Sequence, residues 1–126
     1  MKLLEEKIRQ EGQVIGTDIL KVDMFLNHQI DVNLLDEMGK EFYRLFKDTN
    51  PTLILTIEAS GIGIACLAAR YFGVDVLFAK KSQAKNVTGE TYSSLVRSFT
   101  KGTVFDVRVD KKFISKAWQI VFPIEL

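Results

Sequence analysis

The sequence predicts an α/β fold with a parallel central sheet, and three segments carry this prediction. Two apolar runs, 53–57 and 74–79, are rich in β-branched residues and have the length of buried strands. Between them, residues 64–72 repeat small and apolar side chains as a close-packed helix does. Strand, helix and strand in this order give parallel strands joined by a right-handed crossover. We expect one domain over residues 1–126, because 126 residues leave room for one core.

The first elements of the chain are a helix and an apolar flap. An amphipathic pattern predicts a short helix over 2–11, which Gly12 ends. The apolar segment that follows, 14–26, is broken by Gly16-Thr17-Asp18. It is typical of two short strands or an extended flap, and it ends in the polar residues Asn27-His28-Gln29.

A second helix is predicted over about 32–47, where apolar side chains recur at helical spacing. Asp31 is a suitable N-cap for it, and the Thr49-Asn50-Pro51 turn closes it. The helix that follows the strand 53–57 ends at Phe72, with Gly73 as its C′ residue.

The last part of the chain changes character. Residues 82–91 are polar and without period, which indicates a mobile loop. Alternating side chains over 94–99 and 105–109, separated by 100–103, predict an antiparallel hairpin. A final strand is predicted within 117–122.

Charge and composition exclude several functions. Seventeen basic and sixteen acidic residues give a net charge of +1, so no overall field favours nucleic acid or a membrane surface. No apolar run approaches the roughly 20 residues that span a bilayer. Cys66 is the only cysteine and cannot form an internal disulfide, which fits the cytoplasm. We expect a cytoplasmic protein in which Cys66 is a buried structural thiol.

The turn between the first parallel strand and its helix reads Ser60-Gly61-Ile62-Gly63. Such a turn can offer backbone N–H groups to phosphate oxygens at the positive end of a helix. Glycines also occur in tight turns for steric reasons alone, and the two interpretations are equally weighted from the turn itself.

A second candidate is the lysine pair Lys80-Lys81 at the carboxyl end of the neighbouring strand. Ligands of open α/β sheets bind at this edge, so a lysine here would face the same crevice as the turn. A solvated charge pair is the alternative. The polar loop 82–91 would then be a lid over the crevice.

The third candidate is the flap, 20–29, which combines apolar side chains with amide and imidazole groups. An apolar slot with few hydrogen-bonding groups suits a planar heterocycle, although this segment by itself favours a flap that only packs over the sheet. His28 is the only histidine and lacks partners for metal or triad chemistry. The sequence therefore predicts no catalytic nucleophile and no metal cage.

Four stretches resemble the bacterial xanthine phosphoribosyltransferases, which are type I phosphoribosyltransferases. They are Leu20-Lys21-Val22-Asp23-Met24-Phe25-Leu26-Asn27-His28-Gln29-Ile30-Asp31, Thr56-Ile57-Glu58-Ala59-Ser60-Gly61-Ile62, Val76-Leu77-Phe78-Ala79-Lys80-Lys81, and 92–101. The likeness runs over about residues 1–116 without an obvious gap.

The resemblance implies a phosphoribosyltransferase sheet with flanking helices, an N-terminal hood flap and an antiparallel hairpin. It also implies transfer of ribosyl phosphate from 5-phosphoribosyl diphosphate to N9 of xanthine, with Mg²⁺, by a cytoplasmic homodimer in purine salvage. By matched position, Leu20 and Asn27 would contact the purine. Ala59, Ser60 and Gly61 would hold the diphosphate, with Lys80 or Lys81 assisting.

One family feature is missing from the sequence. The class carries a strand that ends in two acidic residues before a Gly/Thr-rich loop, which hold the ribose hydroxyls and the 5′-phosphate. It is expected soon after Lys116, where the sequence instead reads Ala117-Trp118-Gln119-Ile120-Val121-Phe122-Pro123-Ile124-Glu125-Leu126. We therefore expect a C-terminally truncated, partial domain with weak or no transferase activity. The alternatives are a non-catalytic module that binds purine or diphosphate or forms dimers, and a fragment without a function of its own.

Overall fold

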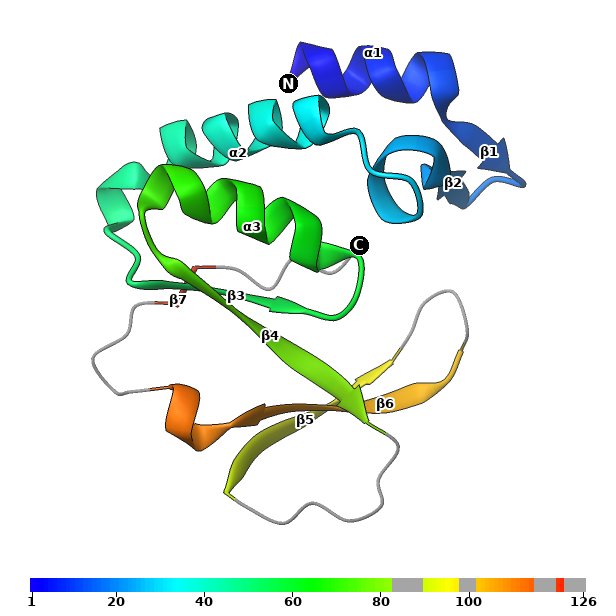
Figure 1. The fold of residues 1–126 in the computed structure, drawn as a ribbon. Helices are drawn as coiled ribbons and strands as arrows, with labels where there is room; N and C mark the ends of the chain where they lie inside the picture. The colour runs from blue at the N-terminus through cyan, green and yellow to red at the C-terminus, as the bar shows by residue number, and fades with distance from the viewer. Residues whose placement is uncertain (83–89, 98–101, 115–119, 122–126) are drawn as a thin grey trace.

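The computed structural model describes residues 1–82, 90–97, 102–114 and 120–121 (Figure 1). Three helices, seven strands and three short helical turns form the described part. In chain order they are α1 (Lys2–Glu11), β1 (Gln13–Ile15), β2 (Ile19–Lys21), the π-helical turn η1 (Asp23–Asn27), α2 (Val32–Phe46), η2 (Lys47–Thr49), β3 (Leu53–Ile57), α3 (Gly61–Phe72), β4 (Asp75–Ser82), β5 (Thr91–Arg97), β6 (Val104–Asp110), η3 (Lys111–Phe113) and β7 (Ile120–Val121).

The central sheet has the strand order β5-β6-β4-β3-β7. Strands β3 and β4 are parallel, with Ile57 opposite Ala79 at their carboxyl ends, as the sequence predicts. Strand β7 continues the parallel part on the other edge of β3. Strand β4 also pairs with β6 in the antiparallel direction, with Lys80 opposite Arg108. The sheet is therefore mixed, and the lysine pair lies within β4 rather than beyond it.

Helices α2 and α3 lie on one side of the sheet (Figure 1). The small side chains of α3 let it approach β3 closely, and Ile54 is buried beneath Ala65 and Ala68. Gly39 of α2 has the same effect between the helices, because a Cβ at this position would lie 3.0 Å from the backbone carbonyl of Leu67. The main core is thus a stack of α2, α3 and β3.

The flap is a two-stranded antiparallel sheet of β1 and β2, followed by η1. The two short strands confirm the sequence-based interpretation, but residues 23–27 form a helical turn instead of an extended flap. The reason is burial: Phe25 is 0% and Leu26 7% exposed, and both pack against α2 and α3. This pair anchors the flap to the core.

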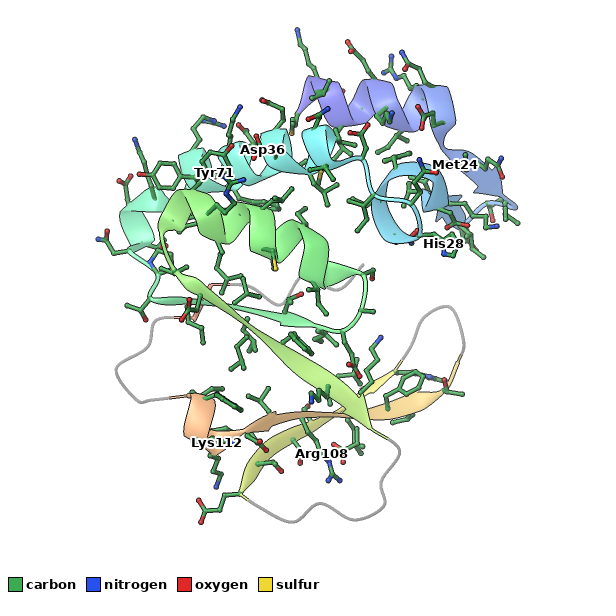
Figure 2. All side chains as sticks on the ribbon, in the orientation of Figure 1. Met24, His28, Asp36, Tyr71, Arg108 and Lys112 are labelled. Carbon is green, nitrogen blue, oxygen red and sulfur yellow. The ribbon has the colours of Figure 1, made fainter. Side chains whose placement is uncertain are left out.

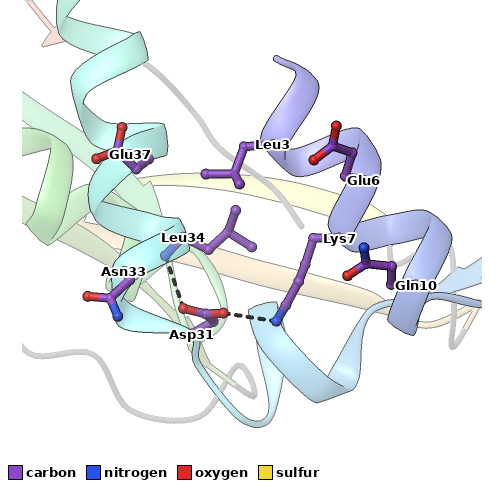
Figure 3. Close-up of a pocket in the computed structure, with 8 residues that line it drawn as sticks. All are labelled: Leu3, Glu6, Lys7, Gln10, Asp31, Asn33, Leu34 and Glu37. Atoms are coloured by element: carbon purple, nitrogen blue, oxygen red, sulfur yellow. Dashed lines mark hydrogen bonds and ion pairs between the residues drawn. The ribbon is translucent and has the colours of Figure 1, made fainter.

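Helix α2 begins at the predicted N-cap. Asp31 Oδ1 accepts a 3.0 Å hydrogen bond from the Leu34 N–H, and Asp31 Oδ2 lies 3.0 Å from the Lys7 ammonium of α1 (Figure 3). The Leu34 N–H, and after it Lys7, lower the pKa of the Asp31 carboxyl from its ordinary value. Glu11, and after it Asp31, raise the pKa of Lys7. One carboxylate thus caps α2 and fixes α1 beside it.

The expectation for Cys66 is wrong, because its side chain is exposed on α3. Ala65, Ala68 and Ala69 occupy the side of the helix that faces the sheet, which leaves Cys66 and Arg70 toward solvent. The tip of the expected lid, 83–89, and residues 98–101 of the expected hairpin lie outside the described residues. Of the expected last strand, the structure describes Ile120 and Val121.

None of the helices among the described residues has the length and apolar character needed to span a bilayer.

Candidate functional site

The turn predicted to bind an anion connects β3 to α3. Residues 58–60 form the turn, and α3 begins at Gly61, which is buried. The Ile62 N–H donates to the Ala59 carbonyl at 3.1 Å, and the Glu58–Ala59 peptide bond is cis. The first turn of a helix presents N–H groups that lack intrahelical acceptors, at the positive end of the helix dipole. Ala59, in the turn before the helix, is exposed, whereas Gly61, the first residue of α3, is buried.

The lysine pair lies directly beside this turn. Strands β3 and β4 are paired up to Ile57 and Ala79, and the Glu58 N–H extends the pairing by donating to the Ala79 carbonyl at 3.0 Å. Lys80 and Lys81 are the next two residues of β4. The structure therefore brings the turn and the lysines together at the carboxyl edge of the sheet, as predicted.

Glu58 is a residue that the sequence-based reasoning did not select. Its Oε1 accepts a 2.6 Å hydrogen bond from the Lys81 backbone N–H, so its side chain joins the turn to β4. The available signal was its place directly after a buried strand, at the edge where polar residues gather. Its partner lies 23 positions away in sequence, which local patterns cannot indicate.

The two lysine side chains lie on opposite faces of β4, since neighbouring residues of a strand alternate. The Lys81 ammonium lies 5.5 Å from the centroid of the Phe105 ring, on the face that carries Ala79 and Val107. Lys80 shares the other face with Val76, which packs under α3. The α3 face is also where the helix N-terminus lies, so the two lysines are not equivalent.

The flap residues predicted to contact the purine are open to solvent. Leu20 lies opposite Val14 in the β1–β2 pair and is 46% exposed. Asn27 ends η1 and is exposed. Figure 2 shows Met24 and His28 at the same end of the molecule, where the hairpin projects. The flap thus presents an apolar side chain and an amide on a surface that Phe25 holds in place.

The structure joins the flap to the turn through Ile30. A Cβ built on Gly63, in the first turn of α3, would lie 3.2 Å from Ile30 Cδ1 and 3.5 Å from Leu35 Cδ2. The second glycine of the turn therefore has a packing role, because it leaves space for Ile30 against the helix. Leu20 and Asn27 belong to β2 and η1, and the diphosphate candidates to a separate edge of the main sheet.

Two hollows in the described part of the chain lie away from the predicted residues. One, of about 280 Å³, lies between α1 and α2 (Figure 3) and is lined by Leu3, Glu6, Lys7, Gln10, Asp31, Asn33, Leu34 and Glu37. The other, of about 240 Å³, lies on the sheet face that carries Leu55, Ala79, Val107 and Val109. The first is a helix-packing groove whose Lys7–Asp31 pair is already formed.

The described residues contain no group of three or more His, Cys, Asp or Glu side chains that could hold a metal ion. The donors at the edge of the sheet are lysines and backbone N–H groups, which suit anions. This part of the chain therefore does not fit a Mg²⁺ ion held by protein ligands alone. Magnesium commonly binds through substrate phosphates and water, and an ion of that kind would arrive with the diphosphate.

A scan against protein-family models gave no match. The chain is 57% identical over 115 residues to the xanthine phosphoribosyltransferase of Ruminiclostridium cellulolyticum, covering 91% of this chain and 60% of that protein. It is 60% identical over 115 residues to the protein of the same name from Clostridium novyi, with the same coverage. The protein of that name from Lachnoclostridium phytofermentans is 51% identical over 121 residues, or 96% of this chain and 62% of that protein. The chain is therefore similar to xanthine phosphoribosyltransferases over more than nine tenths of its own length.

The chain spans about three fifths of the length of these relatives. Solved structures support the fold. An adenine phosphoribosyltransferase from Giardia lamblia, complexed with 9-deazaadenine, matches with a TM-score of 0.65 at 17% identity, over 89% of this chain and 62% of that one. The enzyme from Saccharomyces cerevisiae matches with a TM-score of 0.66 at 16% identity, over 95% and 70%. The predicted phosphoribosyltransferase fold class is confirmed.

Proposed function

We propose that this chain binds xanthine and 5-phosphoribosyl diphosphate and belongs to purine salvage as a xanthine phosphoribosyltransferase. The reaction would give xanthosine monophosphate and diphosphate. The observation that carries the proposal is the 51–60% identity to relatives of that name over more than nine tenths of the chain. The place of the β3–α3 turn at a helix N-terminus, where an anion would be favoured, supports it.

The diphosphate would bind at the carboxyl edge of β3 and β4. Backbone N–H groups around Ala59, Ser60 and Gly61 would donate to its oxygens, where the α3 dipole favours negative charge. Lys80 and Lys81 would add positive charge. We favour Lys80 for direct contact, because its side chain shares a sheet face with α3, whereas the Lys81 ammonium lies over the Phe105 ring on the other face.

The purine would bind at the flap. Leu20 would supply apolar contact to the planar ring, and Asn27 would supply amide hydrogen bonds that select xanthine. Both side chains are accessible on the described surface, and Phe25 and Leu26 keep their backbone anchored in the core. Binding of the base would therefore leave the core around Phe25 and Leu26 unchanged.

Transfer of the ribosyl group would require the base held at the flap to meet the ribose of the substrate held at the carboxyl edge of β3 and β4. As the bond to the diphosphate breaks, positive charge develops on the ribose ring and negative charge on the leaving group. The backbone N–H groups of the turn and the Lys80 ammonium would stabilise that negative charge. Mg²⁺ bound to the phosphates would neutralise part of it. The described residues supply positioning and electrostatics, and we assign no catalytic nucleophile.

A second candidate function is ligand binding without efficient turnover. Among these 126 residues, no apolar run ends in two acidic residues before a Gly/Thr-rich loop, and we assign no groups to the ribose 5′-phosphate. We propose that a polypeptide of these 126 residues binds diphosphate and xanthine and turns over weakly. A homodimer and a cytoplasmic location are further parts of the proposal.

The function is tested by two measurements on the purified 126-residue chain. Formation of xanthosine monophosphate from xanthine and 5-phosphoribosyl diphosphate tests the transferase, and calorimetry with diphosphate and with xanthine tests binding. Binding with little turnover supports the second candidate, and rapid turnover shows that the missing motif is dispensable. A folded chain that binds neither ligand rules out both candidates.

Variants of the lysine pair test the assignment of the anion site. Lys80→Ala should weaken diphosphate binding by about tenfold, the order expected for loss of a charge-assisted hydrogen bond. Lys81→Ala should have a smaller effect, and Lys2→Ala on α1 serves as a charge-matched control. Equal effects for Lys80→Ala and Lys2→Ala would contradict the assignment.

A further inference from the structure

The Glu58 carboxylate occupies the place of a main-chain acceptor in the β3–β4 ladder. The ladder runs to the Glu58 N–H, which donates to the Ala79 carbonyl at 3.0 Å. In a regular parallel ladder, the N–H two residues beyond Ala79 would next meet the main-chain carbonyl of Glu58. This N–H belongs to Lys81, and it donates to Glu58 Oε1 at 2.6 Å.

This replacement has a structural consequence. Because the side chain accepts the ladder hydrogen bond, the main chain can leave the sheet directly after Glu58 and enter the turn. Strand β4 meanwhile keeps its N–H satisfied, which is required of a backbone group within a sheet. The turn and the end of β4 are therefore fixed to each other at one point.

We propose that Glu58 is the positioning residue of the diphosphate site, setting the lysine pair at a fixed distance from the N–H groups of the turn. The peptide that it holds is the one between Lys80 and Lys81, so both side chains depend on it. The Lys81 side chain is fixed from a second direction by the Phe105 ring, 5.5 Å from its ammonium. The inference rests on the proposed function for its ligand, but the link between Glu58 and Lys81 stands on the geometry.

The charge of Glu58 makes the inference testable. A carboxylate beside a polyanion site repels the ligand, so removal of the charge alone would strengthen diphosphate binding. Removal of the acceptor would free the Lys81 N–H and would weaken diphosphate binding. Glu58→Gln removes the charge and retains an acceptor of similar reach, whereas Glu58→Ala removes both. The two variants therefore separate positioning from electrostatics.

The first measurement needs no ligand. Amide hydrogen exchange of Lys81, followed by NMR, should be faster in Glu58→Ala by about tenfold, on the order of a lost charge-assisted hydrogen bond. It should be close to wild type in Glu58→Gln. The Leu55 amide, in the centre of β3, serves as the internal reference, and its exchange should not change. Unchanged Lys81 exchange in Glu58→Ala overturns the inference.

The second measurement is calorimetry with diphosphate and, separately, with xanthine. Glu58→Ala should raise the Kd for diphosphate by about tenfold and leave the Kd for xanthine unchanged. Glu58→Gln should bind diphosphate at least as tightly as wild type. Glu6→Ala, an acidic-to-alanine change on α1, controls for net charge, and thermal unfolding verifies that each variant is folded.

The outcomes are distinct. The positioning role of Glu58 is overturned if Glu58→Ala binds diphosphate as tightly as wild type or more tightly. It is also overturned if Glu58→Ala and Glu58→Gln lose the same diphosphate affinity. If wild type binds no diphosphate, the proposed function is wrong. The hydrogen bond between Glu58 and the Lys81 N–H is then tested by amide exchange alone. Faster Lys81 exchange in Glu58→Ala supports this hydrogen bond, and unchanged exchange overturns it.

Discussion

The Tyr71 hydroxyl of α3 donates a 2.7 Å hydrogen bond to Oδ1 of Asp36 on α2 (Figure 2). It joins α3, which follows the β3–α3 turn, to α2, against which Phe25 and Leu26 of the flap pack. The Asp36 hydrogen bond, followed by burial, raises the pKa of the Tyr71 phenol from its ordinary value. Two parts of the proposed site thus depend on the same helix pair.

The pKa of Tyr71 gives a direct test of this contact. The chain has three tyrosines, and ultraviolet titration should show one phenol that ionises above its ordinary pKa of about 10. In Asp36→Asn the same phenol should titrate at lower pH, because the carboxylate no longer opposes the phenolate. A titration curve that Asp36→Asn leaves unchanged would show that the hydrogen bond does not form in solution.

The same shift affects stability at high pH. Since the pKa is raised in the folded chain, this contribution is complete below about pH 10 and is lost as the pH rises through the folded pKa. The melting temperature of wild type should therefore fall more between pH 9 and pH 11 than the melting temperature of Tyr71→Phe.

Gly39→Ala should destabilise the chain although alanine favours helices. The helix propensity of alanine is worth about 1 kcal/mol over glycine. The new Cβ would lie 3.0 Å from backbone atoms of Leu67, and overpacking costs about 1–3 kcal/mol. We expect a net loss of about 1 kcal/mol in urea unfolding. An increase in stability would show that α3 can shift without cost.

Two substitutions in the flap should affect different properties, one the stability of the chain and the other xanthine binding. Phe25→Ala removes a side chain that is 0% exposed and should reduce the free energy of unfolding by about 3–5 kcal/mol. Leu20→Ala alters an exposed side chain and should leave unfolding nearly unchanged while it weakens xanthine binding. Calorimetry and urea unfolding of both variants check this. Equal xanthine affinity in Leu20→Ala and wild type would remove Leu20 from the base site.

Asp31 should make stability depend on pH in the acid range. Its pKa is lowered in the folded chain, first by the Leu34 N–H and then by Lys7. The contribution is therefore present above the unfolded pKa of about 3.9 and is lost as the pH falls through the folded pKa. The melting temperature of wild type should fall from pH 5 to pH 3. Asp31→Ala should have a lower melting temperature at pH 5 and should lose less of it by pH 3.

The elements with strong local patterns were predicted from the sequence. The strand 53–57, the helix that ends at Phe72 before Gly73, and the Asp31 cap all depend on neighbouring residues, and all three are confirmed. The turn and the lysine pair could be brought together because parallel strands share an edge. The roles of the individual site residues stay predictions.

What the sequence did not predict depends on distant partners. Pairing of β4 with β6 extends the strand to Ser82, and no local period indicates it. Burial of Phe25 against α2 and α3 turned an expected extended segment into a helical turn. Exposure of Cys66 follows from which side of α3 meets the sheet. Each depends on packing between segments that the sequence pattern treats separately.

The β1–β2 hairpin also bears on the kinetics of binding. It has three residues in each strand, all exposed, and an isolated two-stranded hairpin is only marginally stable in water. Its amides should exchange faster than those of β3, and it should open without unfolding of the core. The association rate of the base would then depend on how often β2, which carries Leu20, opens and closes. It would not depend on the stability of the packing between α2 and α3.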